Sequence, residues 1–122
     1  MDEQGQLWAL VYKTLRLKGS ETPNECLNRL TNERLNVPRL RLDSKTTVVS
    51  LERWSIERLR SLETKHQTPY DFDDERPIVV IDLGERKLLV DGNHRVARWL
   101  MEGESKLYEV LLLHPGKNAH RS

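Results

Sequence analysis

The segment 78–103 constrains the fold of this 122-residue chain more than any other part of the sequence. Two short apolar runs, 78–81 and 88–90, lie on either side of a turn and predict a β-hairpin. The polar stretch Asp91-Gly92-Asn93-His94-Arg95 follows at once. Residues 96–101 then show the apolar spacing of a helix, which Gly103 is expected to end. The segment therefore predicts a hairpin that leads through a polar turn into a helix.

The start of that helix is a natural seat for an anion. The first turn of a helix has unpaired backbone N–H groups and the positive end of the helix dipole. His94 and Arg95 add two side chains that bind anions. Gly92 allows a tight turn with positive φ, or a close approach of a phosphate to the backbone. The segment thus predicts a site for a phosphate-bearing ligand.

The composition indicates one polar globular domain. Hydrophobic residues make up 37% of the chain and charged residues 32%, which is untypical of a disordered or membrane protein. No apolar run approaches the roughly 20 residues that span a bilayer. The acidic start Met1-Asp2-Glu3-Gln4 is untypical of a secretory signal, and the single Cys26 excludes an internal disulfide. We therefore expect a cytoplasmic protein.

The charge balance does not by itself indicate a nucleic-acid-binding protein. The chain has 20 basic and 19 acidic residues, whereas proteins that bind duplex DNA usually have a clear basic excess. A local basic cluster, diluted by two acidic neighbours, consists of Arg34, Arg39 and Arg41. It remains a candidate surface for a nucleic-acid or protein partner.

The first 40 residues are predicted to form a helical extension. Apolar residues at three- and four-residue steps predict a helix over 6–17. A second helix is predicted to start at Thr22-Pro23 with a capping box closed by Glu25, to bury Cys26, Leu27 and Leu30, and to end near Arg34 before Val37-Pro38.

The remainder predicts an α+β domain over residues 41–122 with a small mixed β-sheet and packed helices. A strand is expected at 46–49, a helix at 51–62 and a final strand at 107–113. The 51–62 helix would turn Leu51, Trp54, Leu59 and Leu62 inward. The helix after the polar turn, at 95–102, would pack Val96, Trp99 and Leu100 on the sheet. All three tryptophans, Trp8, Trp54 and Trp99, are expected in the core.

The residues Pro77–Ile81 and Leu89–Ala97 resemble the core of the ParB/sulfiredoxin superfamily. The resemblance extends over about residues 46–113, and the Gly-Asn-His-Arg turn ahead of a helix is its specific part. Members of this superfamily bind nucleotides and hold the phosphates at the matching turn. Some hydrolyse CTP, some use ATP to activate a sulfinic acid, some phosphorylate free serine, and others are nucleases. The resemblance thus implies nucleotide handling more strongly than any one reaction.

Differences between this sequence and the superfamily reduce the number of reactions that we expect. Sulfiredoxins carry a catalytic cysteine immediately before the turn histidine, where this chain has Asn93, so sulfinic acid reduction is not expected. Partition proteins continue into helix-turn-helix and dimerisation domains and have a turn richer in arginine. This chain ends nine residues beyond Leu113, and we expect it not to be of that type. The free-serine kinases, with a turn closer to Asp-Gly-X-His-Arg, resemble it most among the enzymes.

Each candidate residue also has a structural interpretation. Arg95 in a first helical turn requires an anion, either a ligand phosphate, which we favour, or Asp91. His94 is a phosphate donor or acid/base, or is structural. Asp91 binds Mg²⁺ or acts as a base, or caps the helix, which we favour, with Asn93 competing for that role. Glu52 is a proton acceptor in the same cleft or an exposed helical residue.

The other acidic and histidine side chains are less specific. The acids between 71 and 75 indicate a solvated loop or, as the alternative, a metal site: Asp71, Asp73, Asp74 and Glu75. The remaining histidines are too scattered in the sequence to indicate zinc: His66, His114 and His120.

The leading hypothesis is a nucleotide-binding protein that acts as an ATP- or CTP-dependent NTPase or phosphotransferase. Gly92 and Asn93 would cradle the phosphates with the backbone N–H groups, while His94 and Arg95 would stabilise the transferring phosphoryl group and Mg²⁺ would bridge to Asp91. The alternatives are a non-catalytic phage or plasmid regulator or inhibitor that binds a protein or nucleic acid, and a DNA-binding ParB-like nuclease. The sequence is thus compatible with an enzyme and with a binding module.

Overall fold

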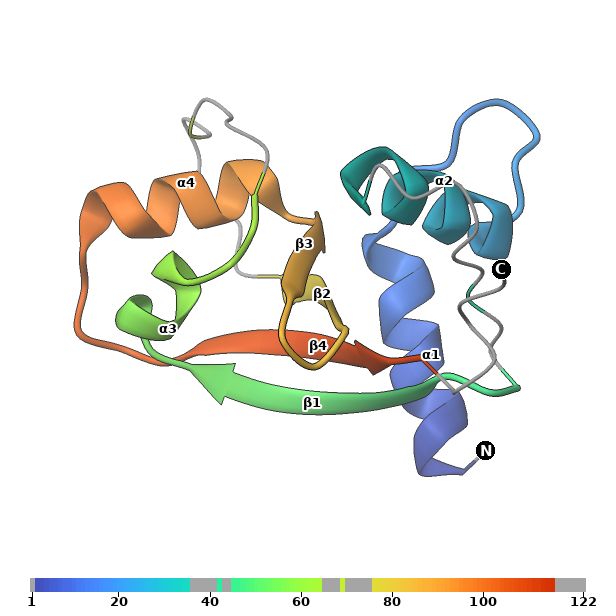
Figure 1. Cartoon of the computed structure of the whole chain (residues 1–122), viewed down its shortest axis with the longest axis horizontal. Coiled ribbons are helices and arrows are strands. Elements are labelled where there is room, and N and C mark those ends of the chain that lie inside the picture. Colours follow the sequence, from blue (N-terminus) through green and yellow to red (C-terminus); the bar gives the residue numbers. More distant parts are fainter. Residues whose placement is uncertain (1, 36–41, 43–44, 65–68, 70–75, 116–122) are drawn as a thin grey trace.

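The computed structural model of the chain describes residues 2–35, 42, 45–64, 69 and 76–115, without the side chains of residues 34 and 35. In chain order, the described elements are α1 (Glu3–Thr14), α2 (Pro23–Leu35), β1 (Val48–Trp54), α3 (Ile56–Arg60), β2 (Ile78–Asp82), β3 (Lys87–Asp91), α4 (Asn93–Glu102) and β4 (Tyr108–His114). These four helices and four strands form a small α+β domain with one mixed sheet (Figure 1). The predicted fold class is confirmed at this level.

The sheet has the strand order β1-β4-β2-β3, so the strand that comes last in the chain lies inside the sheet. Strands β2 and β3 pair antiparallel, which confirms the predicted hairpin. Strand β4 runs parallel to β2 and antiparallel to β1. Helix α4 connects β3 to β4 and thereby carries the chain from the edge of the sheet back to its interior.

Helices cover both faces of the sheet, and the alternation along the strands explains why. Val79 and Ile81 of β2 belong to a cluster with α1 and α2, whereas Ile78 and Val80 belong to a cluster with α3 and α4. Figure 1 shows α1 and α2 together at one side of the molecule and α3 and α4 at the other. Because successive strand residues point to opposite faces, a strand that is covered on both faces is apolar at successive positions, as residues 78–81 of β2 are.

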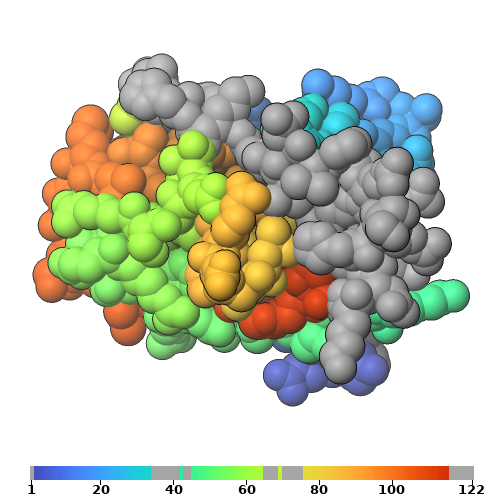
Figure 2. Space-filling view, viewed as in Figure 1, coloured from blue at the N-terminus to red at the C-terminus, as the bar shows by residue number. Residues whose placement is uncertain are grey.

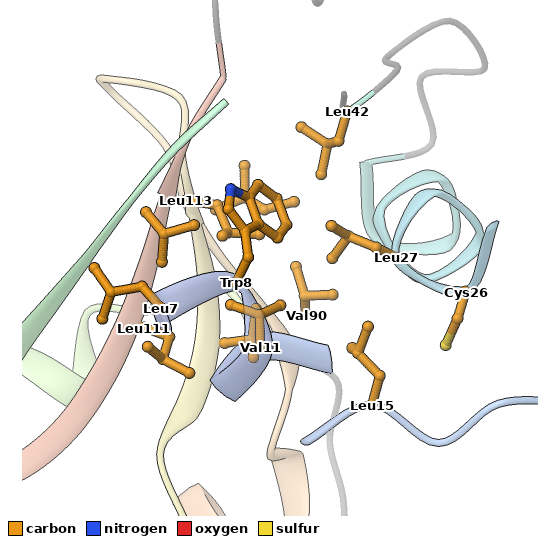
Figure 3. Close-up of a cluster of buried hydrophobic side chains, with 13 residues drawn as sticks. Leu7, Trp8, Val11, Leu15, Cys26, Leu27, Leu42, Val90, Leu111 and Leu113 are labelled. Carbon is orange, nitrogen blue, oxygen red and sulfur yellow. The ribbon is translucent and has the colours of Figure 1, made fainter. Parts of the chain in front are cut away.

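The N-terminal helices share a hydrophobic core with the sheet. Leu7, Trp8 and Val11 of α1 and Leu27 of α2 pack with the strand residues Val90, Leu111 and Leu113 (Figure 3). Trp8, Trp54 and Trp99 are all buried, as predicted. Burial of this kind stabilises by roughly 25 cal/mol per Å² of apolar surface, so the first two helices contribute to the stability of the whole domain.

The predicted ends of the N-terminal helices are partly corrected. Helix α1 spans Glu3–Thr14 rather than 6–17, because Asp2 Oδ1 accepts from Gly5 N at 2.7 Å and caps it. The helix is followed by its C-cap residue, Leu15, whose backbone is extended and whose side chain is buried in the core. Helix α2 has the predicted capping box: Thr22 Oγ1 accepts from Glu25 N, and Thr22 N donates to Glu25 Oε1, each at 3.2 Å.

The predicted helix over 51–62 is wrong for its first half. Strand β1 continues to Trp54 and pairs with β4 over its full length, from Val48 opposite His114 to Trp54 opposite Tyr108. Leu51, predicted to point inward, is 42% exposed, whereas Trp54 is fully buried. Only Ile56–Arg60 is helical, with Ser55 as its N-cap, and Leu59 and Leu62 are buried as predicted. Hydrogen bonding to β4 outweighs the helical spacing.

The segment after α3 packs against the β2–β3 hairpin, and the two lie side by side in Figure 2. Glu63 forms an isolated bridge with Leu88 and a two-point ion pair with Arg86, at 3.0 and 2.9 Å.

The outer edge of β1 is partly covered by α1. The Gln4 side chain donates to Val49 O at 2.7 Å and accepts from Val49 N at 2.9 Å, which protects a sheet edge from pairing with other chains.

The two leucines of the 51–62 segment provide a test of the strand. Leu51→Ala should change the free energy of unfolding by less than about 1 kcal/mol, because the side chain is exposed. Leu59→Ala should cost about 2–5 kcal/mol, because it leaves a cavity in the core. Urea unfolding of both variants measures the difference. Equal and large losses would support a continuous helix over 51–62 instead.

Candidate functional site

The polar turn lies where β3 ends and α4 begins. Helix α4 starts at Asn93, two residues earlier than predicted, and its N-cap is Gly92, which makes no side-chain capping hydrogen bond. The first bond of the helix runs from Val96 N to Gly92 O at 2.9 Å. The backbone N–H groups of the first helical turn therefore come directly after the glycine, in the arrangement that favours an anion.

Gly92 is required by its surroundings. Its backbone angle φ is 111°, which confirms the predicted positive value, and residues with a Cβ atom rarely adopt such an angle. A Cβ atom at this position would lie 2.5 Å from Cγ2 of Ile78 and 3.0 Å from Nη2 of Arg95. The glycine thus allows the turn to pack directly against the start of β2.

Arg95 is almost fully buried, with only 2% of its surface exposed. Its Nη1 donates to the carbonyl oxygens of Arg76 at 3.2 Å and Pro77 at 3.0 Å, and its Nη2 donates to Oδ2 of Asp91 at 3.0 Å. Of the two anions that the sequence allowed for Arg95, the structure shows Asp91. The guanidinium joins α4, the end of β3 and the entry to β2.

Asp91 does not cap α4, contrary to prediction. Its carboxylate pairs with Arg95, one turn into the helix, and Gly92 occupies the N-cap position that Asp91 and Asn93 were expected to fill. Burial raises the pKa of Asp91 above its ordinary value, although the positive charges of Arg95, Arg76 and Arg16 oppose the shift. A carboxyl group with a raised pKa beside arginines is a feature of many functional sites.

The turn forms one side of a pocket of about 320 Å³. The opposite side consists of Thr14 at the end of α1, of residues 16–18 in the segment that follows, and of Arg29, Leu30 and Glu33 in α2. Residues 90–95 and Arg76 complete the lining. Figure 1 shows the start of α4 and α2 on either side of the end of β3.

The lining is strongly basic although the chain as a whole is nearly neutral. It contains two carboxylates, Asp91 and Glu33, and five arginine or lysine side chains, namely Arg16, Lys18, Arg29, Arg76 and Arg95. His94 also lines the pocket. A concave basic surface concentrates anionic ligands more effectively than the same charges spread over a flat surface.

The structure brings five predicted site residues together and separates one. Residues 91–95 all line the pocket. Glu52, the predicted proton acceptor, instead lies in β1, where Oε1 accepts from Trp54 Nε1 at 2.9 Å and pairs with Arg58 at 3.5 Å. It does not line the pocket, because β1 and β3 are opposite edges of the sheet.

Several other predictions concern residues outside the described part of the chain. They are the side chain of Arg34, Arg39 and Arg41 of the basic cluster, the acids at 71 and 73–75, and His66 and His120. Within the described residues, no group of three His, Cys, Asp or Glu side chains is arranged to hold a metal ion. Among these residues, no helix combines the length and apolar character needed to cross a membrane.

His114 belongs to a different polar cluster at the end of β4. Its Nε2 lies 3.0 Å from Ser50 Oγ, and its Nδ1 lies 3.7 Å from Oδ2 of Asp82. Asp82 also accepts from Gly84 N at 2.8 Å, and Lys87 Nζ lies 3.6 Å away. These contacts join β1, β4 and β2 at one end of the sheet, and none of these residues lines the basic pocket.

Four of the pocket's basic residues were not singled out from the sequence: Arg16, Lys18, Arg29 and Arg76. Arg76 directly precedes the apolar run of β2, and the other three lie in the N-terminal helical segment, so no common spacing in the sequence joins the four residues.

Comparison with known proteins finds no family model, curated protein or solved structure that matches the chain. The site is therefore defined by its own geometry.

Two arginines of α4 test the structural role of Arg95. Arg95→Met should lower the free energy of unfolding by about 1.5–3 kcal/mol, because it removes the buried guanidinium that pairs with the half-buried Asp91 carboxylate. Arg98→Met removes a pair with Glu102 at the helix surface and should cost less than about 1 kcal/mol. Chemical denaturation compares them. Equal, small losses would contradict the assignment of Arg95 as a structural brace.

Proposed function

We propose that the chain is a nucleotide-binding protein of the ParB/sulfiredoxin type, which holds the phosphates of ATP or CTP in the basic pocket at the start of α4. The observation that carries the proposal is the convergence of the α4 N-terminus with basic side chains from three other parts of the chain. Backbone N–H groups and arginines together are the usual means by which proteins bind phosphate.

The contacts of Arg95 change which side chains we assign to the phosphates. Arg95 is engaged with Asp91 and two backbone carbonyls, so its part is to shape the turn. Arg76 and Arg16 also act electrostatically on Asp91, which places their charges near the same turn. We assign the direct phosphate contacts at this turn to Arg76 and the first N–H groups of α4.

An NTPase or phosphotransferase activity would use two further residues. Asp91 would hold Mg²⁺ together with the ligand phosphates, and the ion would neutralise charge on the transferring group. His94, which lines the pocket, would take the proton from the attacking hydroxyl group or water. Glu52 is not assigned a role, because it lies in β1 away from the pocket.

A binding module without turnover is the second candidate. Both carboxylates of the lining are in ion pairs, Asp91 with Arg95 and Glu33 with Arg29. Such pairing favours a pocket that binds an anionic group over one that activates a nucleophile. A regulator or inhibitor that binds a protein or nucleic acid would use the same pocket for an anionic group of its partner.

Ligand-dependent stabilisation tests the proposal. ATP or CTP at about 100 times its dissociation constant should stabilise the native state by about 2.7 kcal/mol, measured as a rise in the unfolding temperature with and without Mg²⁺. Arg76→Gln should abolish the rise, whereas Arg53→Gln, which changes an exposed arginine of β1, should preserve it. The absence of stabilisation by ATP, ADP, CTP and GTP would overturn the proposal.

Turnover separates the two candidates. An enzyme should release phosphate or diphosphate only with Mg²⁺, and His94→Gln should remove release while nucleotide binding persists. A binding module should bind and release nothing. A plasmid-nicking assay tests the nuclease alternative. Nicking that is lost in Arg76→Gln would favour a nuclease, whereas nicking that persists in this variant, prepared identically, would indicate a contaminating enzyme.

A further inference from the structure

The basic pocket has a second wall that the superfamily resemblance does not include. Arg16 and Lys18 follow α1, and Arg29 lies on α2. All three belong to the first 40 residues, whereas the resemblance begins at about residue 46. The pocket therefore lies between the polar turn and the N-terminal helices.

The segment that carries Arg16 and Lys18 is held in place by α2. Cys26 Sγ, which is buried, donates to Arg16 O at 3.2 Å. Lys18 N donates to Glu21 Oε1 at 3.1 Å, and the same carboxylate binds Arg29 Nε and Nη2 at 2.8 and 3.0 Å. Burial raises the pKa of Cys26 to about 11, so the thiol stays protonated and able to donate at neutral pH.

The ion pair of Glu21 with Arg29 persists over a wide pH range. The hydrogen bond from Arg29, with a further one from Lys18 N, lowers the pKa of Glu21 from 4.5 to about 2. Its contribution to stability is thus present above pH 4.5 and is lost as the pH falls toward 2. At neutral pH the backbone at Arg16 and Lys18 is held by hydrogen bonds before any ligand binds, which lowers the entropy cost of binding.

We propose that this wall is a second anion subsite of the same pocket, in which Arg16 and Lys18 contact a further anionic group of the ligand and Glu21, Arg29 and Cys26 position them. The inference rests on the proposed phosphate site at the start of α4. It identifies the ligand as a di- or triphosphate rather than a single phosphate, and it makes the N-terminal helices part of the binding site.

The charges of the two walls support a ligand with at least two anionic groups. On the α4 side, Arg76 and Arg95 face the carboxylate of Asp91, an excess of one positive charge. On the N-terminal side, the three cations Arg16, Lys18 and Arg29 face the two carboxylates Glu33 and Glu21, again an excess of one. One phosphate at one wall would leave the positive charge of the other uncompensated.

Calorimetric titration of the full chain with inorganic phosphate, pyrophosphate and tripolyphosphate tests the subsite. At about 0.15 M salt, where screening suppresses distant charges, wild type should bind pyrophosphate at least about tenfold more tightly than phosphate. Lys18→Gln should reduce this ratio to about threefold or less, with phosphate affinity unchanged within about twofold. Lys13→Gln, which changes an exposed lysine of α1 outside the pocket, should match wild type.

The variant Glu21→Gln distinguishes a role of Glu21 in positioning the wall from an effect of the net charge of the pocket. Removing a negative charge beside the pocket would tighten pyrophosphate binding if only the net charge mattered. If Glu21 positions the wall, the ratio of pyrophosphate to phosphate affinity should fall, as in Lys18→Gln. Tighter binding in Glu21→Gln would overturn the positioning role.

Further outcomes distinguish the two proposals. If no phosphate compound binds wild type, the proposed function fails. If phosphate binds but the ratio is near one, or is unchanged in Lys18→Gln, the second subsite fails and the phosphate site at α4 remains. Citrate serves as a polycarboxylate control, and citrate binding equal to that of pyrophosphate would overturn the assignment to phosphates.

Discussion

The buried guanidinium of Arg95 is the interaction on which the rest of the site depends. It joins the carboxylate of Asp91 at the end of β3 to the carbonyls of Arg76 and Pro77 at the entry to β2. Burying a cation costs free energy unless its N–H groups have hydrogen-bond acceptors, and here three acceptors bind the guanidinium. The brace requires Gly92, because a Cβ atom there would contact Ile78 and the guanidinium itself. Together they fix where α4 begins and where its N–H groups lie.

The N-terminal helices acquire a role from this arrangement. They cover one face of the sheet through a shared core, and the segment between them reaches the pocket with Arg16 and Lys18. Stability and binding are thereby linked: Leu15 packs in the core directly beside Arg16, and Cys26 is buried while its thiol holds the Arg16 carbonyl. The basic character of the pocket thus arises from folding, since the chain as a whole carries a formal charge of only +1.

The hairpin, the turn and α4 could be predicted from the sequence because their signals are local: two apolar runs, a glycine and a helical face with Val96 and Trp99. Of strand β1 only the start was predicted, within the strand expected at 46–49, since the spacing of Leu51, Trp54 and Leu59 fits a helix and the partner strand β4 lies far along the chain. The pocket was predicted on one side only. Tertiary packing decides that Arg95 pairs with Asp91 and which basic side chains line the other side of the pocket. The spacing of Arg16, Arg29 and Arg76 in the sequence does not indicate that they share a pocket.

Backbone amide spectra recorded by NMR during a pyrophosphate titration test the central claim most directly, because they locate the ligand on the chain. A ligand between the two walls should shift the amide signals of Asn93 and His94 together with those of residues 16–18, and leave those of α3 and β1 unchanged. The Nη groups of Arg95 should give protected side-chain signals before and after binding, because the ligand does not displace their acceptors. Shifts confined to other parts of the chain, or an Arg95 signal that becomes protected only with ligand, would contradict the account.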